Sequence, residues 1–98
     1  MTTTWSLRID TYNGDILDFY ETTAATRADA LHDLHTAAIA AVSNVAADQL
    51  PLKPRYILEL DRQFHAEVVT GGTTSGTPDH DGARIALEHL HDRYCNTK

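Results

Sequence analysis

The chain has 98 residues, of which 42 % are hydrophobic and 22 % are charged, a composition typical of one globular domain with a single core. Eight basic and fourteen acidic side chains give a net charge of −6, which argues against the concentrated cationic surface that nucleic-acid binding needs. The single cysteine, Cys95, excludes an intramolecular disulfide. No cationic leader and no long apolar run are visible in the sequence, so we expect a cytoplasmic protein that does not bind membranes.

Residues 5–21 alternate in polarity and predict two strands joined by a turn at an Asn-Gly pair. A two-residue loop would pair Ile9 with Asp18 and would mix polar and apolar side chains on both faces. A three-residue loop that ends at Gly14, with this glycine in the left-handed conformation, pairs Arg8 with Asp18 instead. We therefore predict the three-residue loop, because it places the apolar side chains on one face. These side chains are Trp5, Leu7, Ile9, Leu17 and Phe19.

A helix is predicted over residues 27–48. Thr26 can cap its first turn, with Asp29 at the third helical position. Pro51 and Pro54 follow the helix and cannot continue it. Its apolar stripe recurs at helical spacing and consists of Leu31, Leu34, Ala38, Ala41, Val42 and Val45.

The second half of the chain repeats this order. Strands are predicted over residues 55–61 and 64–70, and a last helix over 79–96. In the first of these strands Tyr56, Leu58 and Leu60 share a face, and in the second Phe64, Ala66 and Val68 do. The order β-β-α-β-β-α predicts an α+β fold, with one four-stranded antiparallel sheet and both helices on its apolar face.

The two halves resemble each other slightly. The pairs Ala30-Leu31 and Leu34-His35 recur as Ala86-Leu87 and Leu90-His91. Either the chain is a ββα pseudo-repeat, 5–49 and 55–96, within a single domain 1–98, or two amphipathic helices share this spacing by chance.

Residues 70–81, TGGTTSGTPDHD, raise the question of a phosphate-binding loop. The P-loop pattern needs Lys and Ser or Thr after its last glycine, whereas Thr77 and Pro78 follow Gly76. Pro78 lacks a backbone N–H, and Asp79 and Asp81 already place negative charge at the start of the helix. The stretch is therefore interpreted as a flexible connection.

Six histidines invite a test for a metal site. His32 and His35 lie three apart on one helix and could share an ion, and a third ligand would have to be His65 or a histidine of the last helix. His89 and His91 point to opposite sides of the last helix, and no recognised metal-binding spacing is present. Surface histidines are the simpler interpretation, so we predict no metal and no cofactor, with His32, His35 and His65 as weak candidates.

No constellation of nucleophile, base and acid argues for catalysis, so the chain is not expected to be an enzyme. Apolar residues on the expected outer sides of the helices, Ile39 and Ile85, each lie one turn from a histidine, His35 or His89. They indicate a protein-binding surface, which self-association or a different protein partner would cover equally well. We predict a homodimer, because symmetric pairing is the commonest way for one such surface to cover itself. The function predicted is that of a small acidic, non-catalytic interaction or regulatory protein.

Two alternatives stay open. The acid-rich first half suggests a partner with a basic surface, and the protein could be an inhibitor of a nucleic-acid-binding enzyme that mimics nucleic acid, of the mobile-element type. The histidines leave open a protein that binds a metal or a small ligand.

Overall fold

The computed structural model describes residues 2–45, 52–72 and 78–95 of the chain. Its elements, in chain order, are β1 (Thr3–Asp10), β2 (Ile16–Ala24), α1 (Arg27–Ser43), β3 (Arg55–Leu60), β4 (Gln63–Val69), β5 (Gly71–Gly72), β6 (Pro78–Asp79) and α2 (His80–Cys95).

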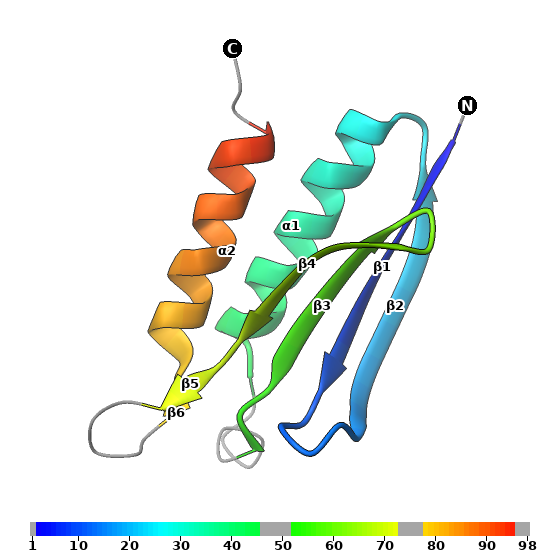
Figure 1. Cartoon of the computed structure of the whole chain (residues 1–98). Coiled ribbons are helices and arrows are strands. Elements are labelled where there is room, and N and C mark those ends of the chain that lie inside the picture. The colour runs from blue at the N-terminus through cyan, green and yellow to red at the C-terminus, as the bar shows by residue number, and fades with distance from the viewer. Residues whose placement is uncertain (1, 46–51, 73–77, 96–98) are drawn as a thin grey trace.

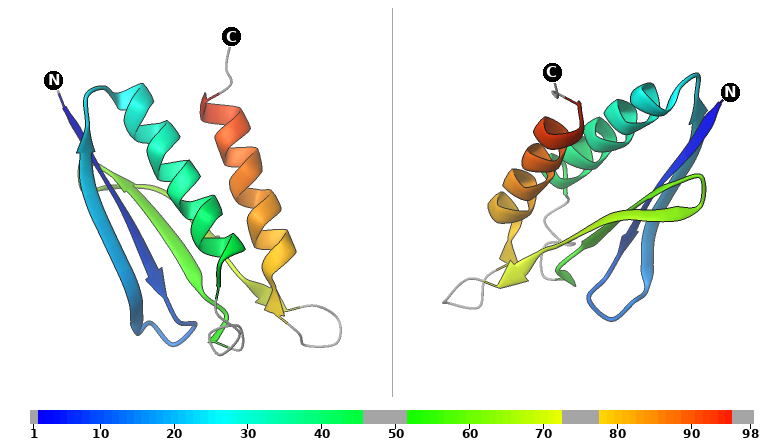
Figure 2. Two further views of the ribbon diagram at one scale, coloured as in Figure 1. Left: turned by 180° about the vertical axis from the view of Figure 1, so that it is seen from behind. Right: turned by 45° about the horizontal axis from the view of Figure 1, so that its top comes forward.

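Four strands form one antiparallel sheet in the order β2-β1-β3-β4, and both helices lie on the same face of it (Figures 1 and 2). Helix α1 covers β1, β2 and β3, whereas α2 packs beside α1 and over β4. The predicted α+β fold is confirmed. No described element covers the opposite face of the sheet, which we call the open face (Figure 2).

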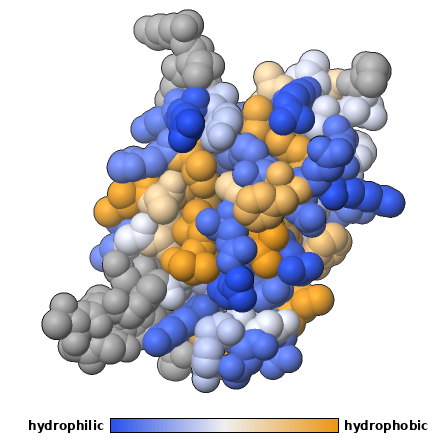
Figure 3. Space-filling view, viewed as in Figure 1, coloured by the Kyte–Doolittle hydropathy of each residue, from blue (hydrophilic) through white to orange (hydrophobic). Residues whose placement is uncertain are grey.

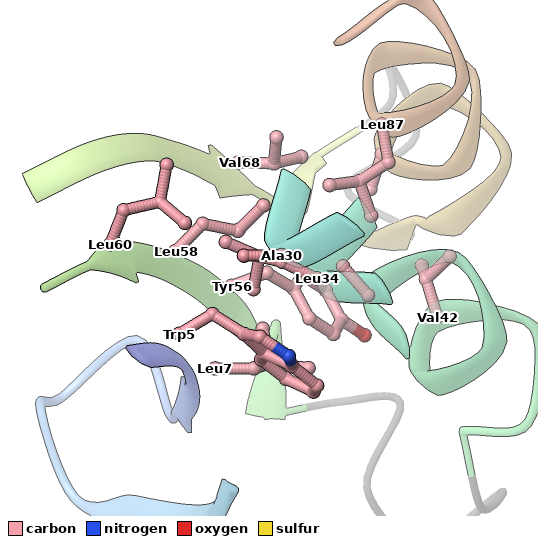
Figure 4. Packing of buried hydrophobic residues seen from close by; sticks show 12 residues of the cluster. Trp5, Leu7, Ala30, Leu34, Val42, Tyr56, Leu58, Leu60, Val68 and Leu87 are labelled. Carbon is pink, nitrogen blue, oxygen red and sulfur yellow. The ribbon is translucent and has the colours of Figure 1, made fainter. Parts of the chain in front are cut away.

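The core lies between the sheet and the helices (Figure 4). β3 alternates as predicted, so that Tyr56, Leu58 and Leu60 are buried toward the helices, and Trp5 and Leu7 of β1 are buried on the same face. Most of the predicted stripes belong to this core. Its buried residues are Trp5, Leu7, Ala30, Leu34, Ala38, Val42, Tyr56, Leu58, Leu60, Val68, Ala83 and Leu87.

The first hairpin has the predicted loop. The N–H of Thr11 donates to the carbonyl of Asp15 at 2.7 Å, which closes a three-residue loop that ends at Gly14. Gly14 has φ +93°, a conformation that a side chain would disfavour. The Oγ1 of Thr11 accepts from two further backbone N–H groups of the loop, at 3.2 and 3.1 Å.

The predicted register of this hairpin is wrong beyond the loop. A bulge at Leu17 shifts the pairing by one residue, so that Arg8 pairs with Phe19 and Ile9 with Asp18. Phe19 therefore lies on the open face and is 50 % exposed, and its predicted place in the core is wrong.

The second hairpin turns through Asp61 and Arg62, both with positive φ (50° and 65°), as a two-residue turn between twisted strands requires. A bulge follows here as well. Leu58 pairs with Ala66 but Glu59 pairs with Phe64, so His65 is the extra residue. Phe64 lies on the open face and is 66 % exposed, so the prediction that it faces the core with Ala66 is wrong.

Helix α1 begins as predicted and ends earlier. The Oγ1 of Thr26 accepts from the N–H of Asp29 at 3.1 Å. The helix ends at Ser43, where the side-chain amide of Asn44 donates to the carbonyl of Ala40 at 2.8 Å. The rest of the predicted helix, residues 46–48, lies outside the described residues.

The glycine stretch begins and ends as a short hairpin. Gly71 pairs with Asp79 and Gly72 with Pro78, where the sequence predicted a flexible connection from strand to helix. Residues 73–77 lie outside the described residues. Thr70 fixes the start of this hairpin, because its N–H and its hydroxyl both donate to the carbonyl of Pro54, at 3.2 and 2.7 Å.

Candidate functional site

Aromatic rings gather where the first turns of α1, the last turns of α2 and β4 meet. His35 of α1 stacks on His65 of β4 with 5.1 Å between ring centroids, and His65 lies 4.8 Å from the ring of Tyr94. His32 contacts His91 across the two helices at 5.4 Å. The members of this histidine cluster are His32, His35, His65, His91 and Tyr94.

The bulge in β4 brings His65 into the cluster. In a regular strand its side chain would alternate with that of Ala66 and lie on the open face. As the extra residue of the bulge, His65 instead reaches the helices beside Ala66. His35 is completely buried where α1 meets both α2 and the sheet.

The Nε2 atoms of His35 and His65 lie 3.0 Å apart. Burial, and then the neighbouring His65, His91 and His32, lower the pKa of His35 to about 4. Burial, and then Arg27, lower the pKa of His65. Both rings are therefore neutral at pH 7, and one Nε2–H donates to the lone pair of the other Nε2.

The structure divides the predicted metal candidates. His35 and His65 face each other, but His32 contacts His91 instead. Two imidazoles on a tetrahedral zinc ion would have nitrogens about 3.4 Å apart, so 3.0 Å fits a hydrogen bond better. Within residues 2–45, 52–72 and 78–95, no group of three or more His, Cys, Asp or Glu side chains is arranged to hold an ion.

The predicted helix surface exists only on α2. His35 is fully buried and Ile39 packs against the core, so their predicted place on an outer surface is wrong. The physical reason is that α1 has two covered sides, one against the sheet and one against α2. Ile85 (46 % exposed) and His89 do lie on the exposed side of α2.

A larger apolar surface lies on the open face of the sheet. Ile16, Phe19, Phe64 and Val69 are each at least half exposed, and Ile57 lies among them. Strand register orders the open face in three rows across β2, β1, β3 and β4. The rows are Ile16, Asp10, Arg55 and Val69; then Phe19, Arg8, Ile57 and Glu67; then Glu21, Ser6, Glu59 and Phe64.

Charges on the open face are partly paired. The Nε of Arg8 contacts both carboxylate oxygens of Asp10 at 3.1 and 3.2 Å, and Arg55 binds Glu67 at 2.6 Å. Within the described chain, Glu21 and Glu59 form no ion pair. The space-filling view in Figure 3 shows apolar atoms (orange) reaching the surface between strongly polar ones (blue).

Comparison with protein-family models, curated proteins and solved structures finds no match to this chain. Neither described helix has the length and apolar character needed to cross a bilayer.

Proposed function

We propose that the protein is a non-catalytic interaction protein of the cytoplasm that binds protein through the open face of its sheet. One observation carries the proposal: four large apolar side chains are at least half exposed on the open face, Ile16 and Phe19 on one edge strand and Phe64 and Val69 on the other. In an antiparallel sheet with one solvent-exposed face, apolar side chains normally point to the core and polar side chains to the solvent. These four apolar side chains point to the solvent instead. Large apolar side chains that are exposed on one face of a protein are typical of protein interfaces.

The occupant that we propose is a second copy of the chain. A two-fold axis that lies across the strands, along the row of Phe19, Arg8, Ile57 and Glu67, leaves this row facing its own copy, with Arg8 bound to Asp10 and Glu67 to Arg55 within each chain. The same axis places Arg55 opposite Glu59 of the partner, Val69 opposite Phe64, and Ile16 opposite Glu21. The glutamate without an ion pair thereby gains a cation, and two exposed apolar side chains cover each other.

Isoleucine methyl groups test this proposal, because the five isoleucines sample different surfaces. Ile16 and Ile57 lie on the open face, Ile9 and Ile39 pack against the core, and Ile85 lies on α2. In a dilution series followed by methyl NMR, we expect the signals of Ile16 and Ile57 to shift with concentration. Shifts confined to Ile85 would instead place the contact on the helix, and an absence of any shift would refute self-association.

The His35–His65 pair favours a second candidate function, the binding of a transition-metal ion. Both imidazoles are neutral at pH 7, as ligands must be, and binding would require their Nε2 atoms to move apart from 3.0 Å to about 3.4 Å. Elemental analysis of protein purified without an affinity tag tests it. Stoichiometric zinc, nickel or copper that a His65→Gln variant lacks would support this role, and metal-free protein would end it.

A further inference from the structure

The outer edge of β2 is the longest unpaired strand edge in the described part of the chain. β2 ends the strand order β2-β1-β3-β4, so no described strand pairs with its outer backbone groups. From Asp18 to Ala24 the strand pairs regularly with β1, which keeps the outer edge extended over this stretch. The other edge strand, β4, is interrupted near its centre by the bulge at His65. A regular unpaired edge is a template for one more strand.

Neither helix covers this edge. Every residue of β2 is exposed or half-buried, and Figure 2 shows the strand at the outside of the sheet beside α1. The side of α1 that lies near Tyr20 carries the small side chains of Ala37, Ala40 and Ala41, which leave room for an added strand. β2 also contains neither lysine nor proline, two residues that proteins use to block edge pairing.

The charge along this edge is negative. Asp18 lies on the helix side of the sheet and Glu21 on the open face, and both residues are exposed. The carboxylate of Asp18 accepts from the N–H of Phe19 at 2.9 Å and from the hydroxyl of Tyr20 at 2.6 Å, and both donors are neutral. Neither acid forms an ion pair within the described chain. Charge complementarity therefore favours a cationic partner.

The same charge argues against a second copy of the chain on this edge. Two copies of β2 would bring the acids of both strands together without a cation on either strand. In the antiparallel register that sets Phe19 opposite Tyr20, Asp18 of one copy faces Glu21 of the other. Like charges directly opposite each other destabilise strand pairing.

The spacing of the two acids defines the sequence that a partner strand needs. Residues opposite each other on neighbouring strands lie on the same face of a sheet. A basic residue opposite Asp18 and another opposite Glu21 are three positions apart in the partner. The two residues between them lie beside the aromatic rings of Phe19 and Tyr20, where apolar side chains fit. The pattern that matches this edge is therefore basic, apolar, apolar, basic.

We propose that the outer edge of β2 binds an extended segment of another protein, which carries this pattern and adds a fifth strand to the sheet. Backbone hydrogen bonds provide the affinity, and Asp18 and Glu21 select the basic residues. Pairing of two open faces leaves strand edges free, so this proposal and the proposed dimer can fail separately.

Peptide titrations followed by the backbone amide NMR signals of the protein test the proposal. The probe is the end-blocked peptide Thr-Thr-Lys-Val-Val-Lys-Thr. One matched peptide replaces both lysines by glutamate, and another replaces both valines by proline, which keeps the charge and prevents regular pairing. We expect the lysine-valine peptide at millimolar concentration to shift the amide signals of β2 saturably, those of Tyr20 and Thr22 among them. The two matched peptides should leave these signals in place.

Variants of the two acids separate their role from that of the backbone. Asp18→Asn combined with Glu21→Gln removes both charges and leaves the strand edge intact. Its affinity for the lysine-valine peptide should fall about tenfold, as expected for two exposed ion pairs. The matched control, Asp81→Asn combined with Glu88→Gln, removes two acids from α2 and should bind the peptide as the parent does.

Three results would overturn the proposal. One is a lysine-valine peptide that moves no amide signal of β2, or that moves only signals of β4. Another is equal binding of the valine and proline peptides, since charge alone would then account for the contact. The third is protection of β2 amides on the outer edge from hydrogen exchange without peptide, which would mean that a second copy of the chain already pairs with this edge.

Discussion

His35 and His65 are thirty positions apart in sequence, yet their Nε2 atoms lie 3.0 Å apart in the core. The contact depends on one extra residue in β4, because the bulge turns His65 from the open face to the helices. Around the pair lie His32 on α1, His91 and Tyr94 on α2, and Arg27, whose charge lowers the pKa of His65 further. A buried, neutral histidine pair has consequences for stability in acid.

The free energy of unfolding should fall between about pH 6.5 and pH 4. The folded-state pKa of His35 is lowered to about 4, so in this range the unfolded chain binds more protons than the folded one. The contribution of the neutral His35 to the free energy of unfolding is therefore fully present above the unfolded pKa of about 6.5. It is lost as the pH falls toward 4, which lowers the free energy of unfolding by roughly 1–3 kcal/mol. Urea denaturation at pH 7 and pH 4.5 measures the change.

The matched variant is His35→Gln, which keeps a hydrogen-bonding group but does not titrate. Its stability should fall less between the two pH values than that of the parent, whereas His89→Gln, at an exposed position, should behave like the parent. Equal acid sensitivity in the parent and His35→Gln would show that His35 is not the group responsible.

Leu58 and Phe19 were both predicted to belong to the core, and the structure separates them. Leu58 is fully buried on β3, so Leu58→Ala should lower the free energy of unfolding by about 2–5 kcal/mol. Phe19 is half exposed on the open face, and Phe19→Ala should cost less than about 1 kcal/mol in the monomer. Chemical denaturation at concentrations that keep the chain monomeric measures both changes. A large loss of stability in Phe19→Ala would contradict the bulge and support the register in which Phe19 faces the core.

Arg62→Gly should stabilise the second hairpin. Arg62 has φ +65°, a conformation that costs a residue with a Cβ about 1–2 kcal/mol and that glycine adopts without this cost. Glycine also raises the conformational entropy of the unfolded chain, which offsets part of the stabilisation. The expected net gain is about 0.5 kcal/mol, seen as a higher denaturation midpoint. Arg93→Gly, in the last turn of α2, is the opposite control and should destabilise; a loss of stability in Arg62→Gly would show that the arginine side chain has a structural role.

The sequence predicted the architecture because polarity patterns and end signals agree along most of the chain. Alternation at Tyr56, Leu58 and Leu60 indicated β3, and the Thr26 cap fixed the start of α1. The two bulges could not be predicted, because an extra residue in a strand leaves no mark in composition or spacing. Both aromatic residues placed on the wrong face, Phe19 and Phe64, lie at these bulges.

The histidine cluster was only partly predictable for the same reason. His35 and His65 were candidates from composition, but their pairing needs the bulge in β4 and the position of α2. His91 and Tyr94 were not candidates, since helix packing decides which side chains of α2 meet α1.

The oligomeric state of variants on the open face tests the central proposal most directly. Size-exclusion chromatography with light scattering, at tens of micromolar and pH 7, should give a dimer for the parent chain. Phe64→Asp and Phe19→Asp should give monomers, because each places a charge in the contact, while Ile85→Asp on α2 should remain dimeric. A monomeric parent chain, or a dimer that Ile85→Asp dissociates and the two open-face variants do not, would contradict the proposal.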